Sequence, residues 1–134
     1  MSSRLKTVRR VAQLRETGAR AAAGAARRAV GDAEMLRDSK IDELSRTTLG
    51  SPGAGLVAEG ARRERLAGAL VEAGAAIVVR VLEQEQAVQH YVAASRTTHL
   101  VSEVCTRHDI AAEATQEAAT QRLMDDLAGT RKNT

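Results

Sequence analysis

The sequence has very few aromatic residues. It contains no Phe, no Trp and a single Tyr, Tyr91, among 134 residues. Large rings supply much of the buried area in ordinary cores, so a thick globular interior is not expected. Much of the apolar content is alanine, whose small side chain suits a narrow seam between helices. The composition therefore favours an all-α protein made of long paired helices.

Proline and cysteine are also scarce. Pro52, the only proline, lies in a Gly-Ser-Pro-Gly-Ala-Gly cluster at 50–55, the one strong helix-breaking cluster in the chain. We therefore predict a single coiled-coil domain over 1–134, with a helix at about 3–48, a loop at about 49–55, a longer helix at about 56–128 and a disordered tail at 129–134. With Cys105 alone, no intrachain disulfide forms, which fits a reducing compartment.

Heptad spacing runs through both predicted helices and indicates a coiled coil. The first frame is Leu5, Val8, Ala12, Arg15, Ala19, Ala22, Ala26, Ala29, Ala33 and Leu36, after which we expect a slip to Ile41, Leu44 and Leu49. The second frame is Leu66, Leu70, Ala73, Ile77, Arg80, Gln84, Ala87, Tyr91, Ala94, Thr98, Val101, Cys105, His108 and Ala112. Ser2 or Ser3 is expected to cap the first helix.

A short loop between helices predicts a long two-helix antiparallel coiled-coil hairpin whose second helix is longer than the first. In that arrangement residue n of the first helix lies near residue 104 minus n, roughly, which places Leu5 near His99. Residues after about Leu100 then extend past the first helix. A lone helix needs a partner or it frays, so this extension indicates a protein-binding role.

The charge pattern leaves a second function class open. The net charge is +3, and six basic residues face one acidic residue among the first twenty. A basic arm can bind nucleic acid, but base-stacking aromatics and known DNA-binding motifs are missing. A nucleic-acid partner is therefore the alternative and not the preferred interpretation.

Neither catalysis nor a cofactor is expected, and no small-molecule substrate. His90, His99 and His108 recur every nine residues, so consecutive histidines point to opposite sides of a helix. Cys105, His108 and Asp109 share a face, but a structural zinc site needs four ligands. No apolar run approaches the roughly 20 residues of a membrane span, and the charged start does not look like a signal peptide, so we expect a cytoplasmic protein.

Both ends of the chain resemble the FliJ family, the small coiled-coil component of the flagellar type III export apparatus. The resemblance rests on the opening Arg-Leu-Lys-Thr-Val-Arg-Arg-Val-Ala-Gln-Leu-Arg-Glu at 4–16, the polar loop, and the closing Gln-Arg-Leu-Met-Asp-Asp-Leu-Ala at 121–128. Tyr91 stands where the family often has an aromatic residue, and Ala94, Arg96, Leu100, Val101 and Val104 follow it in a similar order. The chain departs from the family in its thin basic run and its many alanines and glycines.

The resemblance implies a non-catalytic stalk or adaptor for flagellum biogenesis and protein export. The implied partners are the hexameric flagellar export ATPase, the export gate protein and the export chaperones, reached at the cytoplasmic face of the membrane. The candidate protein-contact residues are Leu5, Val8, Arg9, Arg10, Tyr91, Leu123, Met124, Asp125 and Leu127. A basic helical nucleic-acid-binding protein and a generic helical adaptor are the alternatives.

The length of the predicted second helix gives a direct test. Small-angle X-ray scattering of the purified chain should show a maximum dimension above about 90 Å, because an α-helix rises about 1.5 Å per residue. A scattering profile of a compact sphere would contradict the paired-helix prediction.

Overall fold

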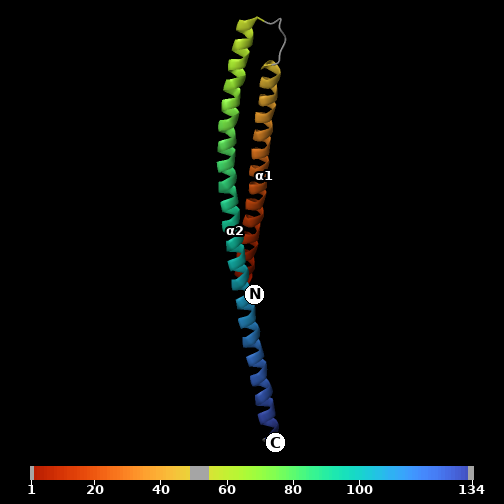
Figure 1. The fold of residues 1–134 in the computed structure, drawn as a ribbon. Helices are drawn as coiled ribbons and strands as arrows, with labels where there is room; N and C mark the ends of the chain where they lie inside the picture. Colours follow the sequence, from red (N-terminus) through yellow and green to blue (C-terminus); the bar gives the residue numbers. More distant parts are fainter. Residues whose placement is uncertain (1, 49–54, 133–134) are drawn as a thin grey trace. The chain divides into compact units, whose positions relative to one another are not determined.

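The computed structural model describes residues 2–48 and 55–132, and nearly all of them are helical. Helix α1 is Ser3–Thr48 and helix α2 is Leu56–Lys132 (Figure 1). The protein is thus all-helical, with two helices that pack against each other and a second helix longer than the first. Neither helix, within the described residues, has a stretch apolar enough to cross a membrane.

The helix limits follow from local signals. The Ser2 Oγ accepts a hydrogen bond from the Leu5 amide at 3.3 Å, so Ser2 caps α1 as one of the two expected serines. Residues 49–54 of the predicted loop lie outside the described part of the chain. At the other end, the expectation of a disordered tail from 129 is wrong for 129–132, because α2 continues to Lys132. Gly129 has no positive φ, so it adopts ordinary helical geometry and does not end the helix.

The backbone of the chain divides into two compact units. Unit 1 is Met1–Thr17 with Ala93–Thr134, and unit 2 is Gly18–Val92. Each has a thin core. Among the described residues, the buried hydrophobic side chains are Ala12 and Cys105 in unit 1 and Val30 and Ala73 in unit 2. Each unit is therefore held by a seam of small and medium side chains.

The predicted register is wrong in unit 1. The Cys105 Sγ lies 3.9 Å from the carbonyl oxygen of Leu5, and the Thr98 Oγ1 lies 3.1 Å from that of Ala12. Leu5 is therefore beside Cys105 and not beside His99, a shift of about six residues toward the C-terminus of α2. Loop length constrains a register only loosely, whereas the fit of buried side chains sets it. The two contacts also run in opposite order along α1 and α2.

The seam of α1 follows a heptad spacing, and six of the ten predicted frame positions are covered: Leu5, Ala12, Ala19, Ala26, Ala29 and Ala33. The partly or fully buried side chains include Ala12, Glu16, Ala19, Ala23, Ala26, Val30, Ala33, Arg37, Lys40, Leu44 and Thr47. Val8, Arg15, Ala22 and Leu36 were expected in the seam and are exposed. The slip expected after Leu36 is absent, because the covered positions continue at the same spacing, and Ile41 is exposed. Leu49 lies outside the described residues.

The predicted frame of α2 agrees better with the structure. The covered side chains include Leu66, Leu70, Ala73, Ile77, Gln84, Ala87, Tyr91, Ala94, Thr98, Val101 and Cys105. Arg80, His108 and Ala112 were expected in the frame and are exposed. Ala112 lies seven residues beyond Cys105, whose partner Leu5 is already close to the start of α1.

Glycines within the helices give a stability prediction. At Gly18, Gly60 and Gly68 an added Cβ would meet nothing within 4 Å, and none of these residues has a positive φ. Alanine is favoured over glycine by about 1 kcal/mol inside a helix. Replacing these three glycines by alanine should therefore stabilise the protein by about 2 to 3 kcal/mol and raise the melting temperature followed by circular dichroism.

The matched control is Ala22→Gly, at an exposed position of α1. It should destabilise the protein by up to about 1 kcal/mol. An unchanged or lower melting temperature for the triple alanine variant would show that helix propensity does not limit the stability of this seam.

Candidate protein-contact site

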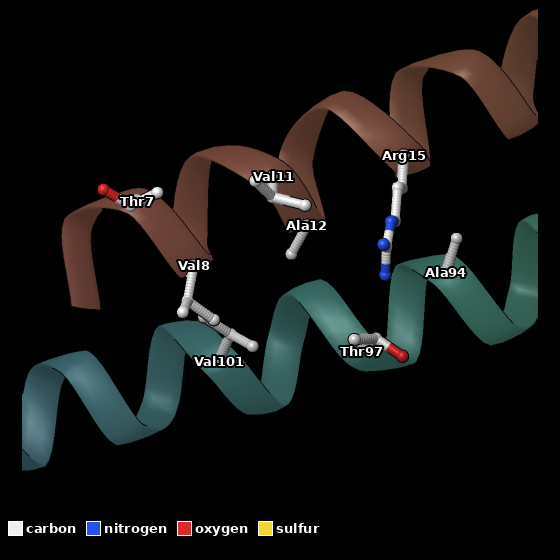
Figure 2. A pocket seen from close by; sticks show the side chains of 8 residues that line it. All are labelled: Thr7, Val8, Val11, Ala12, Arg15, Ala94, Thr97 and Val101. Atoms are coloured by element: carbon white, nitrogen blue, oxygen red, sulfur yellow. The ribbon is translucent and has the colours of Figure 1, made fainter. Parts of the chain in front are cut away.

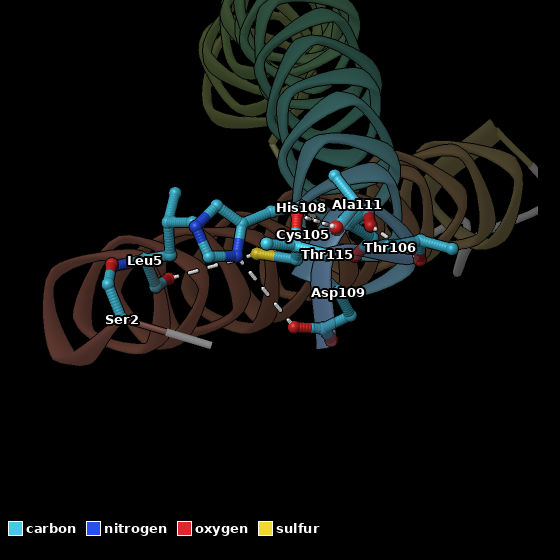
Figure 3. A network of polar contacts seen from close by, with 9 residues as sticks. Ser2, Leu5, Cys105, Thr106, His108, Asp109, Ala111 and Thr115 are labelled. Carbon is cyan, nitrogen blue, oxygen red and sulfur yellow. Dashed lines mark hydrogen bonds and ion pairs between the residues drawn. The ribbon is translucent and has the colours of Figure 1, made fainter. Parts of the chain in front are cut away.

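The cross-helix contact in unit 1 depends on small side chains. Cys105 is 1% exposed, and its Sγ is directed at the Leu5 carbonyl (Figure 3). Two turns away, the Thr98 hydroxyl lies within hydrogen-bond distance of the Ala12 carbonyl at 3.1 Å and of the Ala94 carbonyl at 3.0 Å. Ala12 itself is 6% exposed. Because these side chains are short, the backbone of α1 comes within reach of side chains on α2.

A groove runs beside this contact. It has a volume of about 370 Å³ and is lined by Thr7, Val8, Val11, Ala12 and Arg15 of α1 and by Ala94, Thr97 and Val101 of α2. Figure 2 shows the Arg15 side chain reaching across toward Ala94 and Thr97. The walls are mostly aliphatic, and the one charged lining residue is a cation. The groove can accept apolar side chains that carry a carboxylate nearby.

The start of α1, which supplies one wall of the groove, is rich in basic residues. Arg4, Lys6, Arg9 and Arg10 are all exposed, and Arg15 is a wall residue. Val8 and Val11, between these basic residues, are 50% and 40% exposed. This combination of exposed valines and arginines is typical of a surface that binds other proteins.

Beyond residue 109, the side chains of α2 are exposed to solvent as far as residue 131. Asp109 is the last partly covered residue, and every residue from 110 to 131 is exposed. The extension therefore begins about ten residues later than the sequence suggested. Leu123, Met124 and Leu127 are 64%, 61% and 65% exposed, and their spacing places them on one side of the helix. The exposed segment 110–131 therefore carries an apolar patch formed by Leu123, Met124 and Leu127.

The structure brings only some of the predicted contact residues together. Leu5, Val8, Arg9 and Arg10 share the start of α1, whereas Leu123, Met124, Asp125 and Leu127 lie near the end of α2. Met124 is 19 residues beyond Cys105 along the helix, or about 28 Å. Tyr91 is half-buried and belongs to unit 2. The candidates in unit 1 thus form two separate surfaces, one at the start of α1 and one near the end of α2.

Sequence reasoning missed the groove. Val11, Thr97 and Val101 were not among the candidates, and Arg15 was counted as the polar member of the seam. A usable signal was present, since Val8, Val11 and Arg15 follow the spacing of one helix face.

The histidines and the cysteine do not combine into a metal site. The His99 Nε2 lies 3.3 Å from the Glu103 Oε1, and the His108 Nδ1 lies 4.0 Å from the Asp109 Oδ1. Cys105, the possible third ligand with His108 and Asp109, directs its sulfur at the Leu5 carbonyl instead (Figure 3). No group of three potential ligands close enough to hold a metal ion occurs among residues 2–48 and 55–132.

Comparison of the chain with protein-family models, with curated proteins and with solved structures finds no match.

The Thr98 hydroxyl provides a test of the observed register. Thr98→Val removes the cross-helix hydrogen bond to Ala12 while keeping the side-chain shape, so it should destabilise the protein by about 1 kcal/mol. The control is Thr106→Val, because the exposed Thr106 hydroxyl donates only within its own helix, to Ser102 at 2.9 Å. Chemical denaturation should give a lower free energy of unfolding for Thr98→Val than for Thr106→Val. Equal stability of both would contradict the Ala12–Thr98 contact.

Proposed function

We propose that this protein is a non-catalytic stalk or adaptor of the flagellar protein export machinery. In this role it engages the hexameric export ATPase and couples it to the export gate protein and the export chaperones. The observation that supports the proposal best is the exposed segment 110–131, a helix that continues past its last contact with α1 and carries Leu123, Met124 and Leu127 uncovered. Such a helix offers a ready surface to another protein.

The order of contacts in unit 1 supports the architecture that this role needs. Contacts from Leu5 to Cys105 and from Ala12 to Thr98 are those of an antiparallel pair. We therefore extend the proposal to a long antiparallel coiled-coil hairpin, with the start of α1 and the end of α2 in the same unit. A stalk needs this arrangement, because one end must enter a ring while the rest stays outside.

In this proposal two surfaces contribute to binding, one apolar and one basic. The apolar patch at Leu123, Met124 and Leu127 supplies packing area to the ATPase, at about 25 cal/mol per Å² of apolar surface buried. Exposed Arg9 and Arg10 at the start of α1 attract acidic groups and fix orientation. The protein reaches the cytoplasmic face of the membrane through the export apparatus, as a peripheral component.

Nucleic-acid binding is a second candidate because Arg4, Lys6, Arg9 and Arg10 are all exposed on α1. Phosphate contacts by arginine and lysine give affinity that falls steeply with salt. Stacking on bases usually requires exposed aromatic rings, and Tyr91 is half-buried. Salt-dependent retention on DNA would favour this candidate, and co-purification with a partner other than a hexameric ATPase would favour a generic adaptor.

Deletion of residues 121–134 tests the proposed role. Residues 121–131 are all exposed, so the truncated chain should lose only the helical signal of the deleted residues and should keep its melting temperature within a few degrees. It should nevertheless lose stimulation of the ATPase, measured as phosphate release by the purified hexamer. Full stimulation by the truncated chain would overturn the stalk proposal.

A paired charge reversal tests the basic surface separately. Arg9→Glu with Arg10→Glu should weaken ATPase binding by about tenfold or more, and the deficit should shrink at high salt because screening removes the repulsion. Arg27→Glu with Arg28→Glu is the matched control, since these two exposed arginines lie in unit 2. An equal loss of ATPase binding in the two double variants would show that net charge, and not a specific surface, determines binding.

A further inference from the structure

The groove in unit 1 has a defined chemical preference. Its walls are formed largely by Val8, Val11, Ala12 and Val101, and no acidic side chain lines it. Arg15 closes one end, and Arg4 stands four residues before Val8 on the same row of α1. The side chains that fit such a site are aliphatic and flanked by carboxylates.

The exposed segment 110–131 has those properties. Leu123, Met124 and Leu127 form its apolar patch. Glu117 and Glu113 line a shallow surface about two and three turns before the patch, together with Gln116, Thr120 and Gln121. The segment contains four acidic and two basic residues, for a net charge of −2. Residues 2–20 contain six basic residues and one acidic residue, for a net charge of +5. The groove and the segment are therefore complementary in both polarity and charge.

The segment cannot reach the groove of its own chain. Val101 lines the groove and Met124 lies in the apolar patch, 23 residues further along one unbroken helix, or about 35 Å. Within α2 no described residue has a conformation that would let the chain turn back. The occupant must therefore come from a second molecule.

We propose that the groove between α1 and α2 in unit 1 binds the segment 110–131 of a second copy of this chain. The patch at Leu123, Met124 and Leu127 packs against Val8, Val11 and Val101, and Glu113, Glu117 and Asp126 meet Arg4 and Arg15. Each copy carries one groove and one segment, so reciprocal exchange closes a dimer, whereas one-way exchange would continue into a chain. The dimer buries the same apolar patch that the proposed function assigns to the ATPase, so one molecule makes one of the two contacts at a time; dimerisation is measured on the purified chain without the ATPase, so each proposal has its own test.

Salt and concentration provide the first measurement. Sedimentation equilibrium of the purified full chain should show a reversible monomer–dimer equilibrium in about 0.1 M salt. In about 1 M salt, where the Debye length falls from about 10 Å to about 3 Å, the dissociation constant should rise about tenfold or more. A chain that stays monomeric at every concentration in low salt would overturn the proposal.

Charge exchange tests which surfaces meet. Arg4→Glu with Arg15→Glu reverses the groove, and Glu113→Lys with Glu117→Lys reverses the segment. Each double variant alone should dimerise at least about tenfold more weakly, because like charges then face each other. An equal mixture should recover a dimer containing one copy of each variant, since every groove then meets a segment of opposite charge.

Arg62→Glu with Arg63→Glu is the matched control, because both arginines are exposed in unit 2 and far along α2 from the groove. This control should dimerise like the original chain. Failure of the mixture to recover a dimer, or equal weakening by the control, would overturn the proposed contact. Circular dichroism of every variant must show unchanged helical content, which identifies any variant that has lost its fold.

A disulfide experiment locates the contact without altering charge. A Val8→Cys chain mixed with a Met124→Cys chain should form an intermolecular disulfide between the two new thiols under mild oxidation, whereas the native Cys105 thiol is 1% exposed and protected. Val8→Cys mixed with Val71→Cys is the control, because Val71, at 73% exposure, is more exposed than Met124 at 61%. Equal cross-linking in both mixtures would reject a specific groove.

Discussion

The contact of Ala12 with Thr98 and of Leu5 with Cys105 fixes the rest of unit 1. Short side chains let the Thr98 hydroxyl and the Cys105 sulfur approach the carbonyls of α1. A larger residue at any of these positions would hold the helices apart and remove those polar contacts. The same close approach leaves Val8, Val11 and Val101 beside the seam, where they become groove walls. Register, groove and exposed segment therefore all depend on one pair of close contacts.

The packing between α1 and α2 buries little apolar area along the whole seam, which limits the stability of the fold. Alanine buries little apolar area, and the buried hydrophobic residues that the structure describes are two in each unit. Glycine at Gly31 and Gly74, both partly covered, adds no side chain to the seam of unit 2. Arg37 and Lys40 also occupy covered positions, where their methylene stems pack while the charges stay near water. Stability is consequently spread along the seam and is not concentrated in a core.

The sequence predicted the helices better than their contacts. One breaker cluster and two heptad frames were enough for the limits of α1 and for most covered residues of α2. In α1 the frame failed between neighbours of equal size, such as Ala22 and Ala23, because an alanine-rich stretch satisfies spacings of three and of four equally well. The predicted register was wrong because the register depends on which small side chains of α1 and α2 pack together, and the length of the loop does not determine that pairing. The groove was missed since it requires residues of α1 and α2 whose pairing was unknown.

The exposed segment 110–131 is already helical before any partner arrives. Starting a helix in water is unfavourable, but extending one is not, and the paired part of α2 supplies the starting turns. A partner that docks on this segment therefore does not have to order its backbone, which for a disordered peptide costs about 1 to 2 kcal/mol per residue. Even a modest apolar patch can then give useful affinity, and association does not have to wait for the segment to fold. The preformed helix thus lets a small surface bind a partner that a disordered segment of the same sequence would hold more weakly.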